Sequence, residues 1–281
     1  DDAQVIFETL NTGGEPLNAM DLVRNDVFHR AIRRQEDVHA LMRERWSRFE
    51  DKFWKQEAVQ GRIRKPRIDF FLAHTLAAEP GKEVPLGDLY ARYKAFVASQ
   101  GFDSVDAELA CLVRHAPTYM KLSNPTETDE LCVLARQLTV FDVSTAFPLV
   151  FVIAAADIAD EDRAWLFRRI DSYIVRRALC GLTPKNYNNV FLATVRQLHV
   201  AGINPQGLRT ILNGLSGEAS RWPTDAEFRK ACLTGPLFPG RVDTPKMRAI
   251  LTEIEAGLRA KTRTEEPVTP DLSLLDVDHI L

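Results

Sequence analysis

One stretch decides the fold class: DEDRAWLFRRIDSYIVRRALCG, residues 160–181. It begins with three acidic residues, which the positive end of a helix dipole favours. Its apolar residues recur at the spacing of one helical face, and they are Trp165, Leu166, Ile170, Tyr173 and Ile174. Two arginines stand near its end, and Gly181 follows where a left-handed residue commonly terminates a helix. The stretch is therefore predicted to form one long amphipathic helix.

Most of the remaining sequence shows the same periodicity. Asn18 is placed to cap a helix that buries Val23 and Val27. Further helices are expected over residues 37–55, 67–78, 86–99, 105–120, 127–139, 145–157, 186–200, 206–214, 224–234 and 244–260. Only residues 273–281 are typical of a strand. The predicted fold class is mainly α, a multi-helix bundle array with at most a short strand at the C-terminus.

Composition narrows the class of protein. The chain has 281 residues, of which 45% are apolar and 27% charged, as in ordinary soluble globular proteins. No apolar run approaches the roughly 18 residues that span a bilayer, so no membrane partner is expected. The four cysteines lack zinc-ligand spacing and are predicted to be reduced, mostly buried thiols of a cytoplasmic protein. A start at Asp1 rather than Met favours a piece of a longer protein.

Charge is unevenly distributed along the chain. The net charge is −3, but residues 24–67 contain 13 Lys/Arg and 7 Asp/Glu, a local charge of +6. Such a segment is compatible with a surface that faces nucleic-acid phosphates. The alternative is a solvated helix face on which basic and acidic side chains alternate.

Three basic residues near Gly181 are candidates for DNA binding. Arg176 and Arg177 end the predicted long helix, and Lys185 lies just beyond the glycine turn. Together they could clamp a nucleic-acid phosphate. The simpler interpretation is that the arginines compensate the negative end of the helix dipole.

The N-terminal segment has the features of a phosphate-binding turn. Asn11, Gly13 and Gly14 directly precede a predicted helix start, where backbone N–H groups can turn toward an anion. The segment is no Walker loop, because the closing Gly-Lys-Ser/Thr is absent. An ordinary connection between two helices is the alternative.

The last residues contain an acid directly before a histidine. Asp278 could ligate a divalent metal while His279 deprotonates a water, as in the hairpin of a metal-dependent nuclease. A chance dipeptide would look the same. The other five histidines have no partner at ligand spacing and are interpreted as core or surface residues.

Three segments, in this order, resemble the GmrSD-type modification-dependent restriction endonucleases and related phage-defence proteins. They are IFETLNTGGEPL (6–17) with DLVRN (21–25), YIVRRALCG (173–181) and DHIL (278–281). The segments RWPTDAEF (221–228) and KMRAIL (246–251) are similar to the same family's nuclease half. Such proteins join a ParB-like, nucleotide-hydrolysing domain to an HNH (His-Me finger) nuclease domain.

The resemblance implies three parts. Residues 1–28 would be the tail of the ParB-like domain, 29–160 a helical connector, and 161–281 the helical first part of the nuclease domain. Asp278 would hold the metal, His279 would be the general base, and Asn11, Gly13 and Gly14 would lie near nucleotide. A divalent metal and a nucleoside triphosphate are expected in the full-length protein and neither in this piece, which is expected neither to cleave DNA nor to hydrolyse nucleotide.

The function expected from the sequence is thus part of a nucleotide-regulated, metal-dependent endonuclease that restricts foreign DNA. Two other classes stay open: a non-enzymatic helical scaffold for a partner protein, and a DNA-binding module without catalysis. DNA is the expected partner, and a homo-oligomer is an open alternative.

Overall fold

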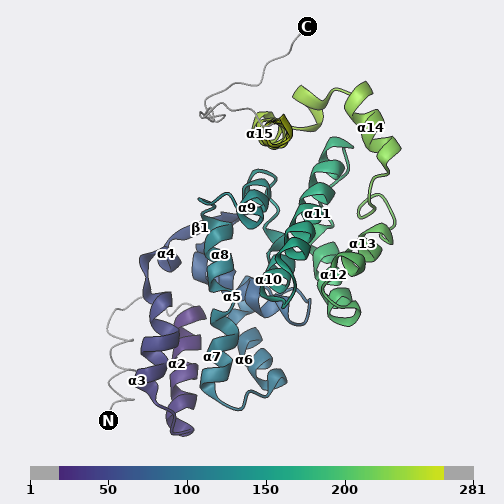
Figure 1. The fold of residues 1–281 in the computed structure, drawn as a ribbon. Helices are drawn as coiled ribbons and strands as arrows, with labels where there is room; N and C mark the ends of the chain where they lie inside the picture. The colour runs from purple at the N-terminus through teal and green to yellow at the C-terminus, as the bar shows by residue number, and fades with distance from the viewer. Residues whose placement is uncertain (1–18, 263–281) are drawn as a thin grey trace. The chain divides into compact units, whose positions relative to one another are not determined.

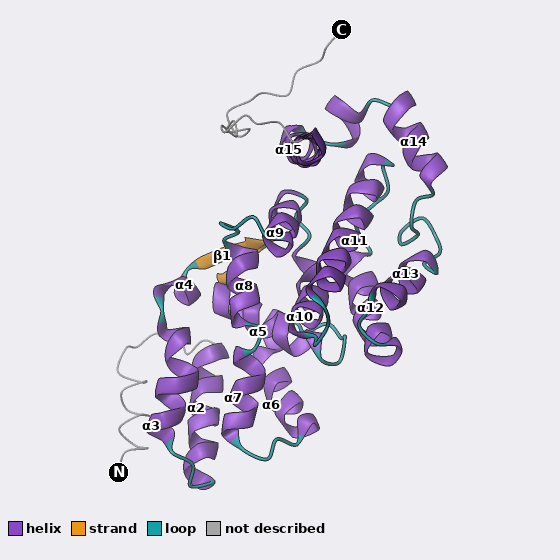
Figure 2. Cartoon of the chain, in the orientation of Figure 1, coloured by secondary structure: helices purple, strands orange, loops and turns teal. Residues whose placement is uncertain are grey.

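The computed structural model describes residues 19–262, which form helices and one small two-stranded sheet (Figures 1 and 2). The predicted fold class, mainly α, is confirmed. The described residues divide into two compact units, and α8 (Ala116–Ser123) carries the boundary between them. The first unit contains residues 19–120 and 147–156, and the second contains residues 121–146 and 157–262.

The first unit is built around α5. Its elements are α2 (Ala19–Arg33), α3 (Val38–Leu41), η1 (Met42–Trp46), η2 (Ser47–Glu50), α4 (Lys52–Lys55), β1 (Glu57–Gln60), β2 (Ile63–Pro66), α5 (Arg67–Ala78), η3 (Leu86–Asp88), α6 (Leu89–Gln100), α7 (Val105–Val113), most of α8, and α10 (Phe147–Ala155). Phe71 of α5 lies in an aromatic core, 5.0 Å from the ring of Trp54 and 5.5 Å from that of Tyr119. This core joins helices that are far apart in the sequence.

Two predicted helices of the first unit are broken. The single helix expected over residues 37–55 is wrong, because α3, η1, η2 and α4 replace it and Asp51 between them is extended. On one straight helix Leu41 and Trp54 would point about 140° apart, and the breaks let both be buried. The helix expected over 105–120 also splits, into α7 and α8, with Pro117 in the first turn of α8.

A β-hairpin was not predicted. β1 and β2 pair antiparallel, with Val59 opposite Arg64, and Gly61 at the turn has φ +58°. Glycine adopts that left-handed conformation without the steric cost that other residues bear. The segment lacks the apolar alternation that reveals a strand, and this is why the helix-based prediction missed it. The strand expected over residues 273–281 lies outside the described residues.

The second unit is organised around α11 (Figure 1). Its elements are α9 (Glu130–Val140), η4 (Ser144–Ala146), α11 (Asp160–Leu179), α12 (Tyr187–Ala201), α13 (Pro205–Asn213), α14 (Asp225–Thr234), η5 (Leu237–Arg241) and α15 (Thr244–Thr262). The predicted long helix is confirmed. Gly181 has φ +69°, and the N–H of Leu182 donates to the carbonyl of Arg177 at 2.9 Å, which closes the helix end. α9, α13, α14 and η5 all contact α11.

The structure can be compared with three further expectations from the sequence: membrane spans, cysteine burial and domain boundaries. Within the described range, no helix is both long and apolar enough to cross a bilayer. The cysteines are free thiols, but only Cys132 is fully buried and Cys232 is exposed, so "mostly buried" is corrected. The predicted boundary after residue 28 falls inside α2, and that at 160/161 falls within the first turn of α11; the functional division of the chain stays a prediction.

Candidate nucleic-acid interface

One side of α11 gathers basic and aromatic side chains. Trp165, Arg169 and Arg176 are separated by four and seven residues, a spacing that puts them within about 40° of one another around the helix. Arg209 of α13 and Trp222 of the loop 214–224 join them. We call these five residues the Arg–Trp cluster, and all belong to the second unit.

Trp222 contacts two side chains of α11, Tyr173 and Arg169. Its ring stacks on Tyr173, with centroids 5.8 Å apart and planes inclined by 26°. On Trp222 the guanidinium carbon of Arg169 lies 3.6 Å from the ring centroid. This separation is well inside the range of a cation–π contact. The ring therefore fixes the position of the Arg169 guanidinium.

Arg169 is a half-buried cation with incomplete hydrogen bonding. Its Nη2 donates to Oδ1 of Asn213 at 3.2 Å, and its buried Nε has no hydrogen-bond partner. Burial lowers the pKa of the Arg169 guanidinium, and the charges of Arg176 and Arg209 lower it further, while Asp225 opposes them. An anion bound at this guanidinium would relieve the repulsion.

The two other arginines complete the positive surface. Arg176 lies over Phe228 at 4.7 Å and over Trp222 at 5.5 Å, and it pairs with Asp225 at 2.6 Å. That carboxylate is 91% exposed, so the ion pair is screened by solvent. Arg209 is exposed and lies over Trp165 at 5.3 Å. Among the described residues, the three guanidinium groups thus form one ion pair, to a solvated carboxylate.

Arg177, the neighbour of Arg176, has a different environment. Its side chain is fully buried, with 0% exposure. It donates to the carbonyls of Arg221 at 2.7 Å, Thr183 at 2.8 Å and Glu218 at 3.1 Å. A guanidinium in this position has no surface to offer a phosphate. We therefore assign Arg177 a structural role in place of the predicted clamp.

That structural role positions the cluster. Two of the three carbonyls that Arg177 binds belong to the loop 214–224, and the hydroxyl of Tyr173 donates to the carbonyl of Ser220 in the same loop at 2.5 Å. Trp222 follows directly after these anchored residues. α11 therefore holds the loop that brings Trp222 back onto Arg169.

Of the remaining predicted site residues, Lys185 alone lies within the described range. Lys185 is exposed in the loop between α11 and α12, where its backbone N–H donates to Thr183 Oγ1 at 3.3 Å. Asn11, Gly13, Gly14, Asp278 and His279 lie outside the described residues. Over residues 19–262, no group of three or more His, Cys, Asp or Glu side chains could hold a metal ion.

Sequence reasoning missed most of the cluster. The stripe of Trp165, Arg169 and Arg176 on one predicted helix was a usable signal. No local pattern could show that Trp222 and Arg209 approach this stripe, because tertiary packing brings them there. Comparisons with protein-family models, curated proteins and solved structures each found no match to the chain.

Proposed function

We propose that the chain binds the phosphate backbone of DNA through Arg169, Arg176 and Arg209. Phosphate contacts from arginine are the commonest source of affinity in protein–DNA complexes. The observation that supports this proposal best is Arg169, a partly desolvated guanidinium close to two like charges, Arg176 and Arg209. Its guanidinium donates to one side chain, Asn213, whereas the guanidinium of the structural Arg177 donates to three carbonyls.

The aromatic residues support backbone binding rather than base stacking. The ring of Trp222 already stacks on Tyr173 and lies 3.6 Å from the guanidinium carbon of Arg169. A nucleobase would need a free ring face. The tryptophans instead restrict the rotamers of the guanidinium groups, which lowers the entropy lost when a phosphate binds.

The test is binding of a fluorescent DNA duplex of about 20 base pairs, followed by anisotropy at low salt. Arg209→Ala is expected to weaken binding roughly three- to tenfold, since one phosphate contact is lost. Among the described residues Arg209 forms no ion pair, so its removal leaves no carboxylate unpaired. Arg168→Ala is the matched control, because it removes the same charge from an exposed position of α11 that pairs with Glu130. Equal weakening by both variants would show a general charge effect and contradict the proposal.

We further propose that this DNA binding serves a metal-dependent endonuclease that restricts foreign DNA in the cytoplasm. The support is the resemblance of the five quoted segments to the GmrSD-type enzymes. In that proposal Asp278 holds a divalent metal, His279 acts as general base, and Asn11, Gly13 and Gly14 lie near a nucleoside triphosphate. Its test is metal-dependent cleavage of modified DNA by a protein that carries the whole nuclease domain, with His279→Ala as the inactive variant.

A protein-binding scaffold is the second candidate function. It is favoured by α15, on which Leu251, Ile254 and Leu258 are exposed on one side of the helix. Apolar residues grouped this way often cover a partner surface. Under this alternative, substitutions in the Arg–Trp cluster would leave duplex affinity unchanged, whereas Ile254→Glu would abolish capture of the partner.

A further inference from the structure

The basic segment 24–67 consists of two electrostatically different parts. Residues 24–51 contain seven Lys/Arg and six Asp/Glu, a net charge of +1. Residues 52–67 contain six Lys/Arg and one Asp/Glu, a net charge of +5. Nearly the whole excess of +6 therefore lies in α4, the β1–β2 hairpin and the first residue of α5. We call residues 52–67 the basic hairpin region.

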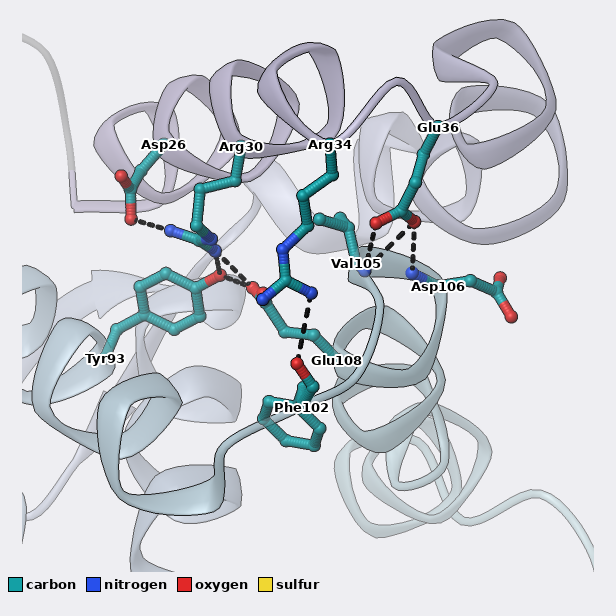
Figure 3. A network of polar contacts seen from close by, with 9 residues as sticks. All are labelled: Asp26, Arg30, Arg34, Glu36, Tyr93, Phe102, Val105, Asp106 and Glu108. Carbon is teal, nitrogen blue, oxygen red and sulfur yellow. Dashed lines mark hydrogen bonds and ion pairs between the residues drawn. The ribbon is translucent and has the colours of Figure 1, made fainter.

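Arginines of the first part are mostly engaged within the protein. Arg30 pairs with Asp26 and with the buried Glu108 of α7, whose carboxylate also accepts from the hydroxyl of Tyr93 (Figure 3). Arg34 donates to the carbonyl of Phe102 at 3.1 Å (Figure 3). These side chains join α2 to α6 and α7, so they are structural contacts.

Other arginines of the same part are also paired. Arg45 binds Asp106 through both Nε and Nη2, at 2.7 and 3.0 Å, and Arg24 pairs with Glu50 at 3.1 Å. Glu36 contacts the backbone N–H of Asp106, while the carboxylate of Asp106 points away from Glu36 (Figure 3). The first part of the segment therefore has little charge left for an external partner.

The basic hairpin region has its charge on the surface. Its exposed basic residues are Lys52, Lys55, Arg62, Arg64 and Lys65. The one carboxylate of the region, Glu57, pairs with Arg64 at 3.3 Å. Arg67 is half-buried, and its guanidinium carbon lies over the ring of Phe53, 4.4 Å from the centroid. Five exposed cations therefore share one exposed acid.

The hairpin is anchored on one face and open on the other. Gln60 contacts Nε2 of His74 through Oε1 at 2.9 Å, and the N–H of Arg67 donates to the carbonyl of Gln56 at 2.9 Å. Strand side chains alternate, so Val59 and its cross-strand partner Arg64 occupy the opposite, exposed face. A Cβ built on Gly61 at the tip would meet nothing within 4 Å. The turn therefore projects into solvent.

We propose that the basic hairpin region is a second DNA-binding surface, whose two-stranded ribbon lies against duplex DNA. This inference rests on the proposed function. A two-stranded β-ribbon fits the major groove of B-DNA, and exposed Arg and Lys side chains at its tip and base can reach the flanking phosphates. An anionic membrane is a weaker fit, because the region exposes only Val59 and Ile63 as large apolar side chains.

The experiment compares two double variants of the 281-residue chain. Lys55→Gln with Arg62→Gln removes two charges from the basic hairpin region, at residues that form no ion pair within the described part of the chain. Arg33→Gln with Arg43→Gln removes two exposed charges from the first part of the segment and is the control. Duplex affinity is measured by anisotropy between 50 and 200 mM salt, and thermal unfolding confirms that both variants fold. The hairpin variant is expected to bind roughly tenfold more weakly than the control and to have a salt slope smaller by about 2.

The outcomes separate this inference from the proposed function. If the hairpin variant binds like its control while Arg209→Ala weakens binding, the hairpin inference is overturned and the proposed function stands. The reverse pattern supports the hairpin and overturns the Arg–Trp cluster. A wild-type chain that does not bind the duplex at 50 mM salt overturns both. Binding of the same variants to vesicles that contain phosphatidylserine tests the membrane alternative. If the hairpin variant loses vesicle binding but keeps its affinity for the duplex, the hairpin inference is also overturned.

Discussion

At the scale of single residues, Arg176 and Arg177 show how one step along a helix separates two environments. They are adjacent in sequence, yet Arg176 lies on the aromatic surface of Trp222 and Phe228 while Arg177 is fully buried. The difference arises because Arg177 faces the loop 214–224, whose carbonyls replace water around its charge. Sequence alone predicted a pair of equivalent cations.

Arg177→Lys is expected to destabilise the second unit by about 2–4 kcal/mol, because one ammonium cannot reach three carbonyls and leaves buried acceptors unsatisfied. The free energy of unfolding in urea measures this. Arg176→Lys is the neighbouring control and should change it by less than about 1 kcal/mol. Similar losses for both variants would mean that Arg177 does not anchor the loop.

The buried His115 predicts that the folded protein loses stability at acidic pH. Its ring is 1% exposed, stacks on Phe151 at 4.9 Å, and neither ring nitrogen has a hydrogen-bond partner among the described residues. Burial lowers the pKa of His115 to about 3. The unfolded chain therefore takes up a proton near pH 6.5 that the folded chain refuses, and stability falls as pH decreases from about 6.5 to 3, by at most about 5 kcal/mol.

His115→Phe should remove this component of acid sensitivity and keep the ring stack. The free energy of unfolding, measured at pH 7 and at pH 5, is expected to change less with pH than in the wild type. His29→Phe, at an exposed position, serves as control. An unchanged difference between the two pH values in His115→Phe would refute the assignment.

At the scale of elements, the helices with clear end signals were predicted best. The helix over residues 67–78 was predicted with both of its ends correct. The helix that ends before Gly181 was also predicted, because its acidic start, its apolar periodicity and the terminal glycine all indicate the same element. The helix over 37–55 failed because burial of Leu41 and Trp54 overrides local propensity. The hairpin was missed because a polar, exposed strand has no alternation of apolar residues that could reveal it.

The packing of α11 against α9 is expected to weaken as pH rises. Asp171 of α11 is half-buried with one oxygen unpartnered. Burial, together with the nearby carboxylates of Glu253 and Glu130, raises the pKa of Asp171 to about 7. An acid whose folded pKa is raised contributes its stability below about pH 4 and loses it as pH rises toward 7.

Asp171→Asn is therefore expected to stabilise the chain at pH 8 and to have little effect at pH 4. The full pKa difference corresponds to about 4 kcal/mol, and partial exposure reduces the expected gain to about 1–3 kcal/mol. Urea unfolding at both pH values measures it. A gain of the same size at pH 4 would show that ionisation of this carboxyl is not the cause.

At the scale of the whole molecule, the sequence predicted the helical class and one of the cluster's three arginines, Arg176. The rest of the Arg–Trp cluster depends on Trp222, which reaches α11 only because Arg177 and Tyr173 hold the preceding loop. Likewise, only the structure shows that Arg45 and Arg30 pair with the distant acids Asp106 and Glu108. Long-range contacts of this kind leave no local signature in sequence.

The most direct measurement of the central claim is the salt dependence of duplex binding by the chain carrying Arg176→Ala and Arg209→Ala. Because each phosphate contact contributes about 0.9 to the slope of log affinity against log salt, the double variant should lose about 2 units of slope relative to the wild type. Arg168→Ala with Arg196→Ala, two exposed positions in the same unit, is the matched control. Identical slopes for the two double variants would contradict the claim that these arginines bind DNA phosphates.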